Sequence, residues 1–251
     1  MGKYFTSTCK PTIAASKQHA GAFSAGHVLF DWTELEVPKG TSCIRSVTML
    51  TRPKGDAGPT ANQFTLSLLY STSDTTSLGT VRAAPDKVPN DDIIGVTEFS
   101  SNNYARSSVI STSVATAGGA NDDDGQAFPP LIVTPDPITG TNVGFDKIYV
   151  AGVAMGAWVW GQTVNQIADA DIDTSSPGTT LVLDGSGMDI REHFIAGDVL
   201  HAHDDAVIGT VASVTNDTTL ELTEAISTGV LEDDDYVYNL NPLTFIFGFE
   251  K

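Results

Sequence analysis

The stretch LTFIFGF (243–249) decides how the chain is organised, because apolar side chains occupy every second position. Strand residues two positions apart point to the same face, so this segment would present one apolar stripe. The stripe consists of Leu243, Phe245, Phe247 and Phe249. We expect so aromatic a strand to be buried, and therefore to complete a sheet formed by earlier parts of the chain.

The same alternation recurs along the 251 residues, in FTLSLLYS (64–71), RSVTML (45–50) and DKIYVAGVAM (146–155). The last of these is apolar enough to predict a central strand. The composition, with 30 Thr, 20 Ser, 23 Gly and 12 Pro, is typical of strands joined by many turns. Helical periodicity is nearly absent. We therefore predict an all-β fold, a jelly-roll-like β-sandwich that carries a smaller unit.

A shift in charge marks that smaller unit. Residues 165–238 contain 16 acidic residues and one basic residue, whereas the remaining residues contain 15 acidic and 12 basic ones. Most of the formal net charge of −18 thus lies in one segment. Because the aromatic stripe follows this segment, we expect 165–238 to be an insert. Residues 1–164 together with 239–251 would form the sandwich.

Within the insert, short alternating runs are separated by polar turns, which predicts about five strands and a small acidic β-barrel. The runs are TTLVL (179–183), GDVLHAH (197–203), AVIGTVASV (206–214), TTLELT (218–223) and DYVYNL (235–240). The ND pair at 216–217 is a turn signal between two of them.

Charge and cysteine content exclude several classes of function. The 13 Lys and Arg residues form no cluster, so nucleic acid and anionic membranes are poor partners. Cys9 and Cys43 could pair at most once and lack zinc-site spacing. The first residues do not resemble a signal peptide, and no apolar run is long enough to span a membrane. We expect a soluble protein made in the cytoplasm.

The segment HAHDD (201–205) is a candidate metal site. His201 and His203 would share one face of a strand and could both bind a metal, with His193, Asp204 or Asp205 as a third ligand. A cupin-type site would need a later Glu and His, which are missing here. The favoured interpretation is a strand end with two outward histidines, followed by a hairpin turn.

Two further groups are weaker candidates. Asp169, Asp171 and Asp173 have the spacing of a calcium loop, but Thr174 and Thr180 stand where a Gly and an acidic ligand are needed. Trp158 and Trp160 could stack on a glycan if they are exposed, although core packing is favoured. No nucleophile or phosphate-binding motif is present. We therefore predict no enzyme and no cofactor.

The run FIAGDVLHAHDDAVIGTVASVTNDTTLELTEA (194–225) resembles a small β-barrel module of tailed-bacteriophage virion proteins. WTELEVPKGTSCIRSVTML (32–50) also looks like the opening strands of phage β-sandwich structural proteins. The resemblance implies a structural role in the particle. Together with the charge distribution, which would place the sandwich on the capsid and the acidic barrel outward, it suggests a capsid decoration, or cement, protein on the outer surface of the virion. Its partners would be the major capsid protein and copies of itself, as a homo-trimer. The alternatives are a tail or fibre component with a glycan-binding role, and a metal-binding β-barrel enzyme.

Overall fold

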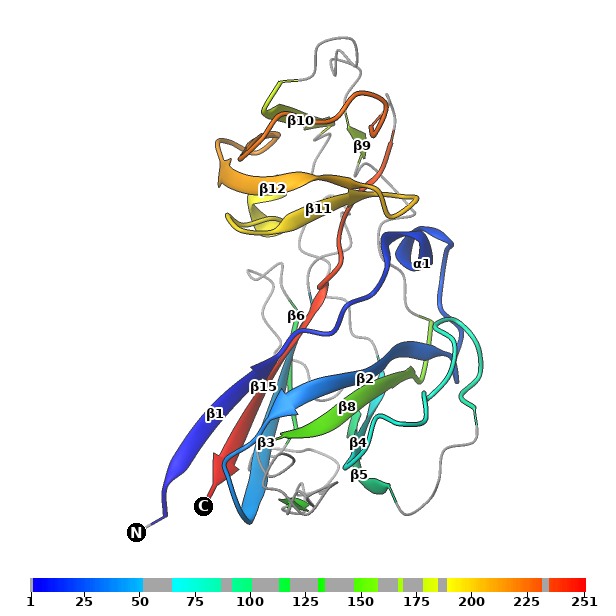
Figure 1. The fold of residues 1–251 in the computed structure, drawn as a ribbon, viewed down its shortest axis with the longest axis vertical. Coiled ribbons are helices and arrows are strands. Elements are labelled where there is room, and N and C mark those ends of the chain that lie inside the picture. The colour runs from blue at the N-terminus through cyan, green and yellow to red at the C-terminus, as the bar shows by residue number, and fades with distance from the viewer. Residues whose placement is uncertain are drawn as a thin grey trace.

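The computed structural model contains almost only antiparallel strands, arranged in two lobes (Figure 1). The structure describes residues 2–51, 65–86, 92–100, 113–117, 131–133, 147–157, 167–168, 178–184, 189–231 and 235–251. We call the lobe built from β1 to β8 and β15 the two-sheet lobe, and the lobe built from β9 to β14 the acidic lobe. The all-β expectation is confirmed.

The first sheet of the two-sheet lobe has the order β1-β15-β3-β6, with β7 also paired to β3. Its strands are β1 (Tyr4–Cys9), β15 (Leu243–Glu250), β3 (Ser42–Thr51), β6 (Ser113–Ala117) and β7 (Leu131–Val133). The last of these strands in the chain, β15, lies in the interior of the sheet, where it pairs with β1 on one side and β3 on the other. The prediction that the stretch 243–249 completes a sheet is confirmed.

The second sheet has the order β2-β8-β4-β5. Its strands are β2 (Val28–Glu36), β8 (Lys147–Ala154), β4 (Leu66–Ser71) and β5 (Ile93–Phe99). The predicted central strand, β8, is central, since it pairs with both β2 and β4. Gly152 on β8 makes room for an aromatic ring, because a Cβ at this position would lie 2.3 Å from Cε1 of Phe30.

The two sheets share one hydrophobic core. Phe245, Phe247 and Phe249 are each at most 1% exposed, so the alternation in β15 fixes which face is buried. The ring of Phe245 lies 5.7 Å from that of Phe30, and the ring of Phe247 lies 6.3 Å from that of Tyr70 on the second sheet. The aromatic stripe of β15 is thus the contact between the sheets.

The acidic lobe has a single strand path, β14-β11-β12-β13-β10-β9. Its strands are β9 (Ile167–Ala168), β10 (Thr180–Asp184), β11 (Val199–Ala202), β12 (Val207–Val214), β13 (Thr219–Leu222) and β14 (Val237–Asn239). Asn216 shapes the predicted turn at 216–217, since its Oδ1 accepts hydrogen bonds from the amides of Thr218 and Thr219, both at 2.8 Å.

The acidic lobe has its own core, separate from that of the two-sheet lobe. The strand path is open in the described part of the chain, where its end strands β9 and β14 do not pair. A closed barrel, as expected from the sequence, is therefore not formed by these strands. The physical reason is that β9 spans only two residues and β14 only three, which leaves little edge for closure.

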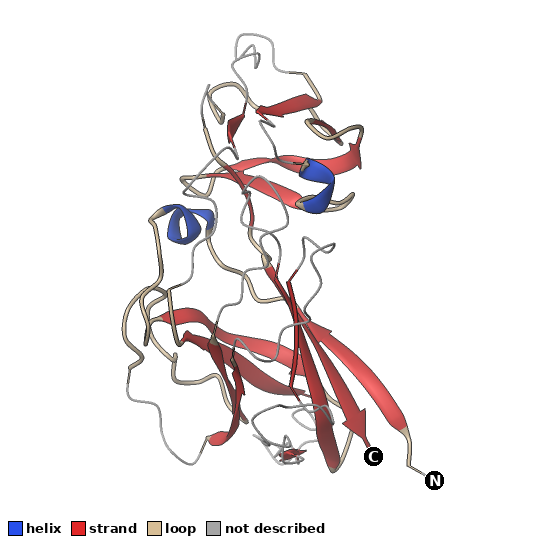
Figure 2. Ribbon diagram, turned by 180° about the vertical axis from the view of Figure 1, so that it is seen from behind, coloured by secondary structure: helices blue, strands red, loops and turns tan. Residues whose placement is uncertain are grey.

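Two short helical segments complete the described fold, α1 (Ala15–His19) and a 3₁₀ turn at Ile190–Glu192 (Figure 2). Helix α1 lies between the two lobes and is the main departure from the sequence-based expectation. Within the described residues, neither segment is long and apolar enough to cross a membrane. Cys9 and Cys43 are both free thiols, and burial raises the pKa of Cys9 to about 12.

Replacing Phe247 by alanine is expected to lower the free energy of unfolding by about 3–5 kcal/mol, because it opens a cavity in the shared core. Thr244→Ala, on the opposite face of the same strand, is the matched control and should change stability by less than about 1 kcal/mol. Urea unfolding followed by far-UV circular dichroism measures both. Equal effects of the two substitutions would contradict the assigned faces of β15.

Candidate functional site: the junction between the lobes

The segment HAHDD (201–205) forms the end of β11 and the turn into β12. Leu200 and Ala202 are buried in the core of the acidic lobe at 0% and 1% exposure. His201 and His203 therefore lie on the other face, as the alternation predicts. This face is not simply solvated, because it is turned toward the junction with the two-sheet lobe.

The turn after β11 holds Asp205 in a left-handed backbone conformation, with φ of +75°. Aspartate tolerates this region better than most residues, because its short polar side chain can hydrogen-bond locally. The amide of Asp205 donates to the carbonyl of Ala202 at 3.1 Å, and His201 Nδ1 lies 3.0 Å from the Asp205 carbonyl. The Asp204 carboxylate accepts from the Ala206 amide at 3.0 Å. These contacts fix the direction of the Asp205 side chain.

That side chain caps helix α1 from the other lobe. Asp205 Oδ1 accepts from the Ser16 amide at 2.9 Å, and Oδ2 accepts from the Ser16 hydroxyl at 2.6 Å. The residue at the N-cap position, Ala14, provides no side-chain acceptor, so Asp205 takes over this role. Burial acts to raise the pKa of Asp205, but the hydrogen bonds from Ser16 outweigh it, and the pKa is lowered.

At the other end of α1, His19 contacts a cluster of rings in the acidic lobe. Its ring centroid lies 5.1 Å from that of His203, 5.2 Å from that of Tyr236 and 6.0 Å from that of Tyr238. His19 Nδ1 lies 2.8 Å from the Tyr238 hydroxyl. Burial raises the pKa of Tyr238, so its hydroxyl stays protonated and can donate to a neutral imidazole. Burial and the neighbouring His203 lower the pKa of His19.

Gln18 joins α1 to the strand that connects the lobes. It is 3% exposed, and its Nε2 donates to the carbonyls of Ile13 at 2.7 Å and Asn239 at 2.9 Å. The amide of Ile13 donates to the Leu240 carbonyl at 2.7 Å. The segment before α1 and the segment between β14 and β15 are thus held side by side by the backbone.

Arg82, in the two-sheet lobe, holds the end of α1 and the turn that follows. Its Nη1 donates to the carbonyls of Lys17 and Gly21 at 3.2 and 2.6 Å. Its Nη2 donates to those of Ala20 and Ala22 at 3.0 and 3.2 Å. Since the last carbonyls of a helix lack intrahelical partners, this guanidinium stabilises the C-terminal end of α1 as Asp205 stabilises its N-terminal end.

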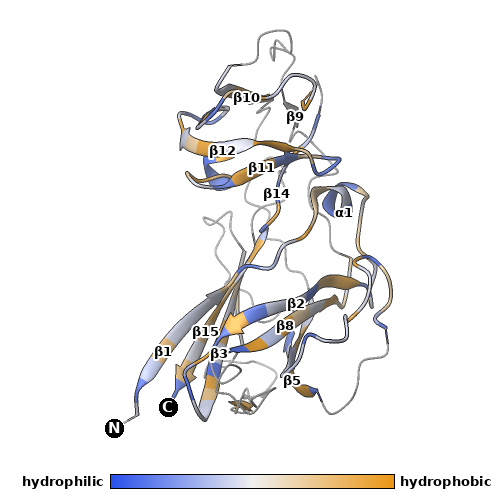
Figure 3. Cartoon of the chain, viewed as in Figure 1, coloured by the Kyte–Doolittle hydropathy of each residue, from blue (hydrophilic) through white to orange (hydrophobic). Residues whose placement is uncertain are grey.

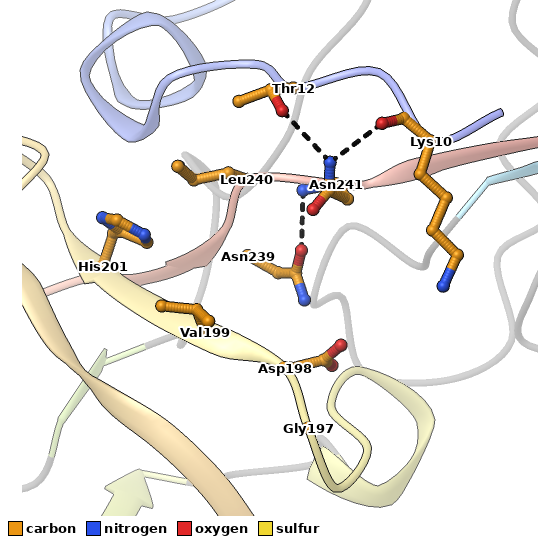
Figure 4. A pocket seen from close by; sticks show the side chains of 9 residues that line it. All are labelled: Lys10, Thr12, Gly197, Asp198, Val199, His201, Asn239, Leu240 and Asn241. Atoms are coloured by element: carbon orange, nitrogen blue, oxygen red, sulfur yellow. Dashed lines mark hydrogen bonds between the residues drawn. The ribbon is translucent and has the colours of Figure 1, made fainter. Parts of the chain in front are cut away.

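A cavity of about 370 Å³ lies beside the junction, between the lobes (Figure 4). Its lining comes from β11 and the residues before it, from the connection between β14 and β15, and from the residues after β1. Figure 4 shows Asn241 linked to the residues after β1, with its Nδ2 donating to the Lys10 carbonyl at 3.2 Å and lying 3.4 Å from Thr12 Oγ1. The cavity wall is mostly polar, and the hydrogen bonds of Asn241 hold the connection between β14 and β15 against the residues after β1.

The candidate metal ligands do not converge in the part of the chain that the structure describes, where no group of three His, Cys, Asp or Glu side chains could hold a metal. His203 Nδ1 lies 3.5 Å from a carboxylate oxygen of Asp235, while His193 is buried beside Phe194. The calcium-loop candidates Asp169, Asp171 and Asp173, and the glycan candidates Trp158 and Trp160, lie outside the described residues.

The sequence did not reveal α1 as part of this site, because five helical residues give no readable periodicity and the cap is supplied from 189 residues away. One signal was present. The pair Asp204–Asp205 in a tight turn suggests a left-handed residue with an outward carboxylate, although nothing in the sequence names its partner. With this geometry established, comparison gives no relative: no family model, no curated protein and no solved structure matches the chain.

Asp205→Gly is expected to loosen the junction, because it removes the cap of α1 while still permitting a positive φ. Amide hydrogen exchange at Ser16 should become faster, by about tenfold for a loss of about 1.4 kcal/mol. Asp217→Gly removes the same charge from an exposed turn of the same lobe and should leave Ser16 protected. The role of Asp205 as a cap is refuted if both variants behave alike.

Proposed function

We propose that this chain is a structural protein of a tailed-bacteriophage particle, a decoration protein that binds the outer surface of the head. In this proposal the two-sheet lobe is a jelly-roll-like sandwich that docks on the shell. The acidic lobe is a barrel-like module that projects away from it. The observation that carries the proposal is the separation of charge between the lobes.

The charge separation favours an outward acidic lobe. Residues 165–238 hold 16 acidic residues against one basic residue, and the rest of the chain holds 15 against 12. A lobe with net charge −15 would be repelled by packaged DNA, so it is better placed on the outside of a shell than on the inside. The same charge would keep neighbouring projections apart in solution and on a crowded surface.

The first sheet offers a docking face that carries almost no net charge. The five described strands of this sheet contain only one Arg and one Glu, Arg45 and Glu250, and these pair with each other at 2.6 Å. Because Phe245 and Phe247 face the core, the residues that alternate with them face outward, and so do the residues paired with those in β1 and β3. This outer face carries Thr6, Thr8, Thr48, Thr116, Thr244 and Ile246.

We call this surface the neutral face because its strands carry almost no charge. Figure 3 shows its edge strand β1 largely in pale colours, which mark intermediate hydropathy. A neutral face on a chain of net charge −18 is where another protein can approach with the least electrostatic cost. Threonine hydroxyls can hydrogen-bond a partner, as Thr48 and Thr116 already do with each other at 3.2 Å. The partner in this proposal is the major capsid protein, with copies of the chain arranged as a trimer.

The proposal is tested by adding the purified chain to heads of its own phage that lack it. We expect the chain to bind and to raise the temperature at which the heads release DNA. Reconstruction of the particles should then show the acidic lobe as the outermost density. A chain found in the tail or inside the shell, or one that does not bind, would overturn the proposal.

A pair of matched substitutions tests the neutral face itself. Thr6→Glu places a charge on the exposed neutral face, and binding to heads should weaken by about tenfold or more, because a charge desolvated without a partner is costly. Thr223→Glu, at an exposed position of the acidic lobe, is the control and should bind like the unmodified chain. Circular dichroism confirms that both fold. Equal binding of the two variants would argue against this docking face.

A further inference from the structure

We propose that the junction between the lobes is an acid-sensitive latch, in which protonation of His19 and His203 releases helix α1 from the acidic lobe. The inference rests on the geometry of the junction and does not depend on the proposed function. It starts from two histidines, His19 on α1 and His203 in the acidic lobe, whose ring centroids lie 5.1 Å apart. Two imidazolium ions at this distance would repel each other across the junction.

The groups around His19 come from every element packed against it. The turn after β11 provides His203, and the segment leading into β14 provides Asp235, Tyr236 and Tyr238. On and around α1 itself, Lys17 lies on the helix, Asp205 binds its first turn, and Arg82 binds carbonyls at its C-terminal end. The acidic residues Glu232, Asp233 and Asp234, which precede Asp235, lie outside the described residues.

Asp235 stabilises one of the two possible positive charges better than the other. Its carboxylate lies 3.5 Å from Nδ1 of His203, so a protonated His203 would be paired with it. His19 is held differently, because its Nδ1 faces the hydroxyl of Tyr238, which remains protonated and donates most readily to a neutral ring. Protonation is therefore less favourable at His19, the residue that docks α1 on the acidic lobe, than at His203.

The direction of the pH effect follows from the pKa of His19. Burial and His203 lower this pKa in the docked state, whereas in an undocked state it returns toward its ordinary value of about 6.5. The docked state therefore binds fewer protons. Docking is at full strength above the ordinary pKa of histidine and weakens as the pH falls through the lower pKa of docked His19.

The cap formed by Asp205 does not account for such a transition. The pKa of Asp205 is lowered in the docked state, so its contribution is present above the ordinary aspartate pKa and is lost only below it. Between about pH 5 and 7 the Asp205 carboxylate stays charged in both states, so it does not drive a change in this range. Acid release in this range is thus a specific signature of the histidine pair.

Small-angle X-ray scattering of the full chain as a function of pH tests the latch. The radius of gyration should be constant above neutral pH and should increase below about pH 6, as the lobes separate while each keeps its own core. Circular dichroism should show that the strands persist through this change. A radius of gyration that stays constant down to pH 4.5 would overturn the proposal.

Three substitutions connect the transition to the histidine pair. His19→Gln should abolish the increase in the radius of gyration between pH 5 and 7. His203→Gln removes the neighbouring imidazole that lowers the pKa of His19, so the transition should move to lower pH. His27→Gln, on the two-sheet lobe beside Ser24, is the matched control and should behave like the unmodified chain.

The His203→Gln variant still tests the proposal if His19→Gln prevents α1 from docking on the acidic lobe at neutral pH. In that case the shift in His203→Gln, together with NMR titration of the His19 ring in the unmodified chain, reports on the same pair. The ring of His19 should titrate below the ordinary histidine pKa. An unshifted transition in His203→Gln, or an ordinary titration of His19, would contradict the latch.

Discussion

The pairing of β15 with both β1 and β3 is the constraint on which the rest of the structure depends. One strand near the C-terminal end joins the first strand of the chain to the third within a single sheet. Its buried phenylalanines also provide the contact with the second sheet. Because β8 and β15 both belong to the two-sheet lobe, the chain between them must leave this lobe and return to it. The acidic lobe is formed by this part of the chain, between β8 and β15.

Much of this arrangement could be predicted from the sequence, because alternation over several residues reports directly on burial. The stripe at 243–249, the central position of 147–154 and five of the six strands of the acidic lobe all depend on local pattern. The outward position of His201 and His203 followed from the same rule. Strand pairing at short range is thus well encoded in the residues themselves.

The junction could not be predicted, because its partners are distant in the chain and few in number. Helix α1 is too short to be stable alone, and depends on Asp205 at one end and Arg82 at the other. Closure of the expected barrel depends likewise on how far the end strands extend, which periodicity does not determine. Each of these features is decided by tertiary contacts that override local preference.

The two caps of α1 belong to different lobes, and this gives the helix a particular role. Asp205 ties it to the acidic lobe and Arg82 ties it to the two-sheet lobe, while Gln18 binds the last residue of β14. Each bond contributes only about 1 kcal/mol. Because all of them act on five residues, the helix couples the positions of the lobes. Motion of one lobe must either move α1 or break a defined set of bonds.

The place of β15 in its sheet also has a consequence for how the chain acquires its structure. During synthesis the strands β1 and β3 emerge early, but the strand between them emerges only after the whole acidic lobe has been made. The acidic lobe, whose strands are close in sequence, can form while the core of the two-sheet lobe still lacks β15 and its phenylalanines. The two-sheet lobe must wait for long-range pairing, which is slow to find. The acidic lobe is therefore expected to fold before the two-sheet lobe into which it is inserted.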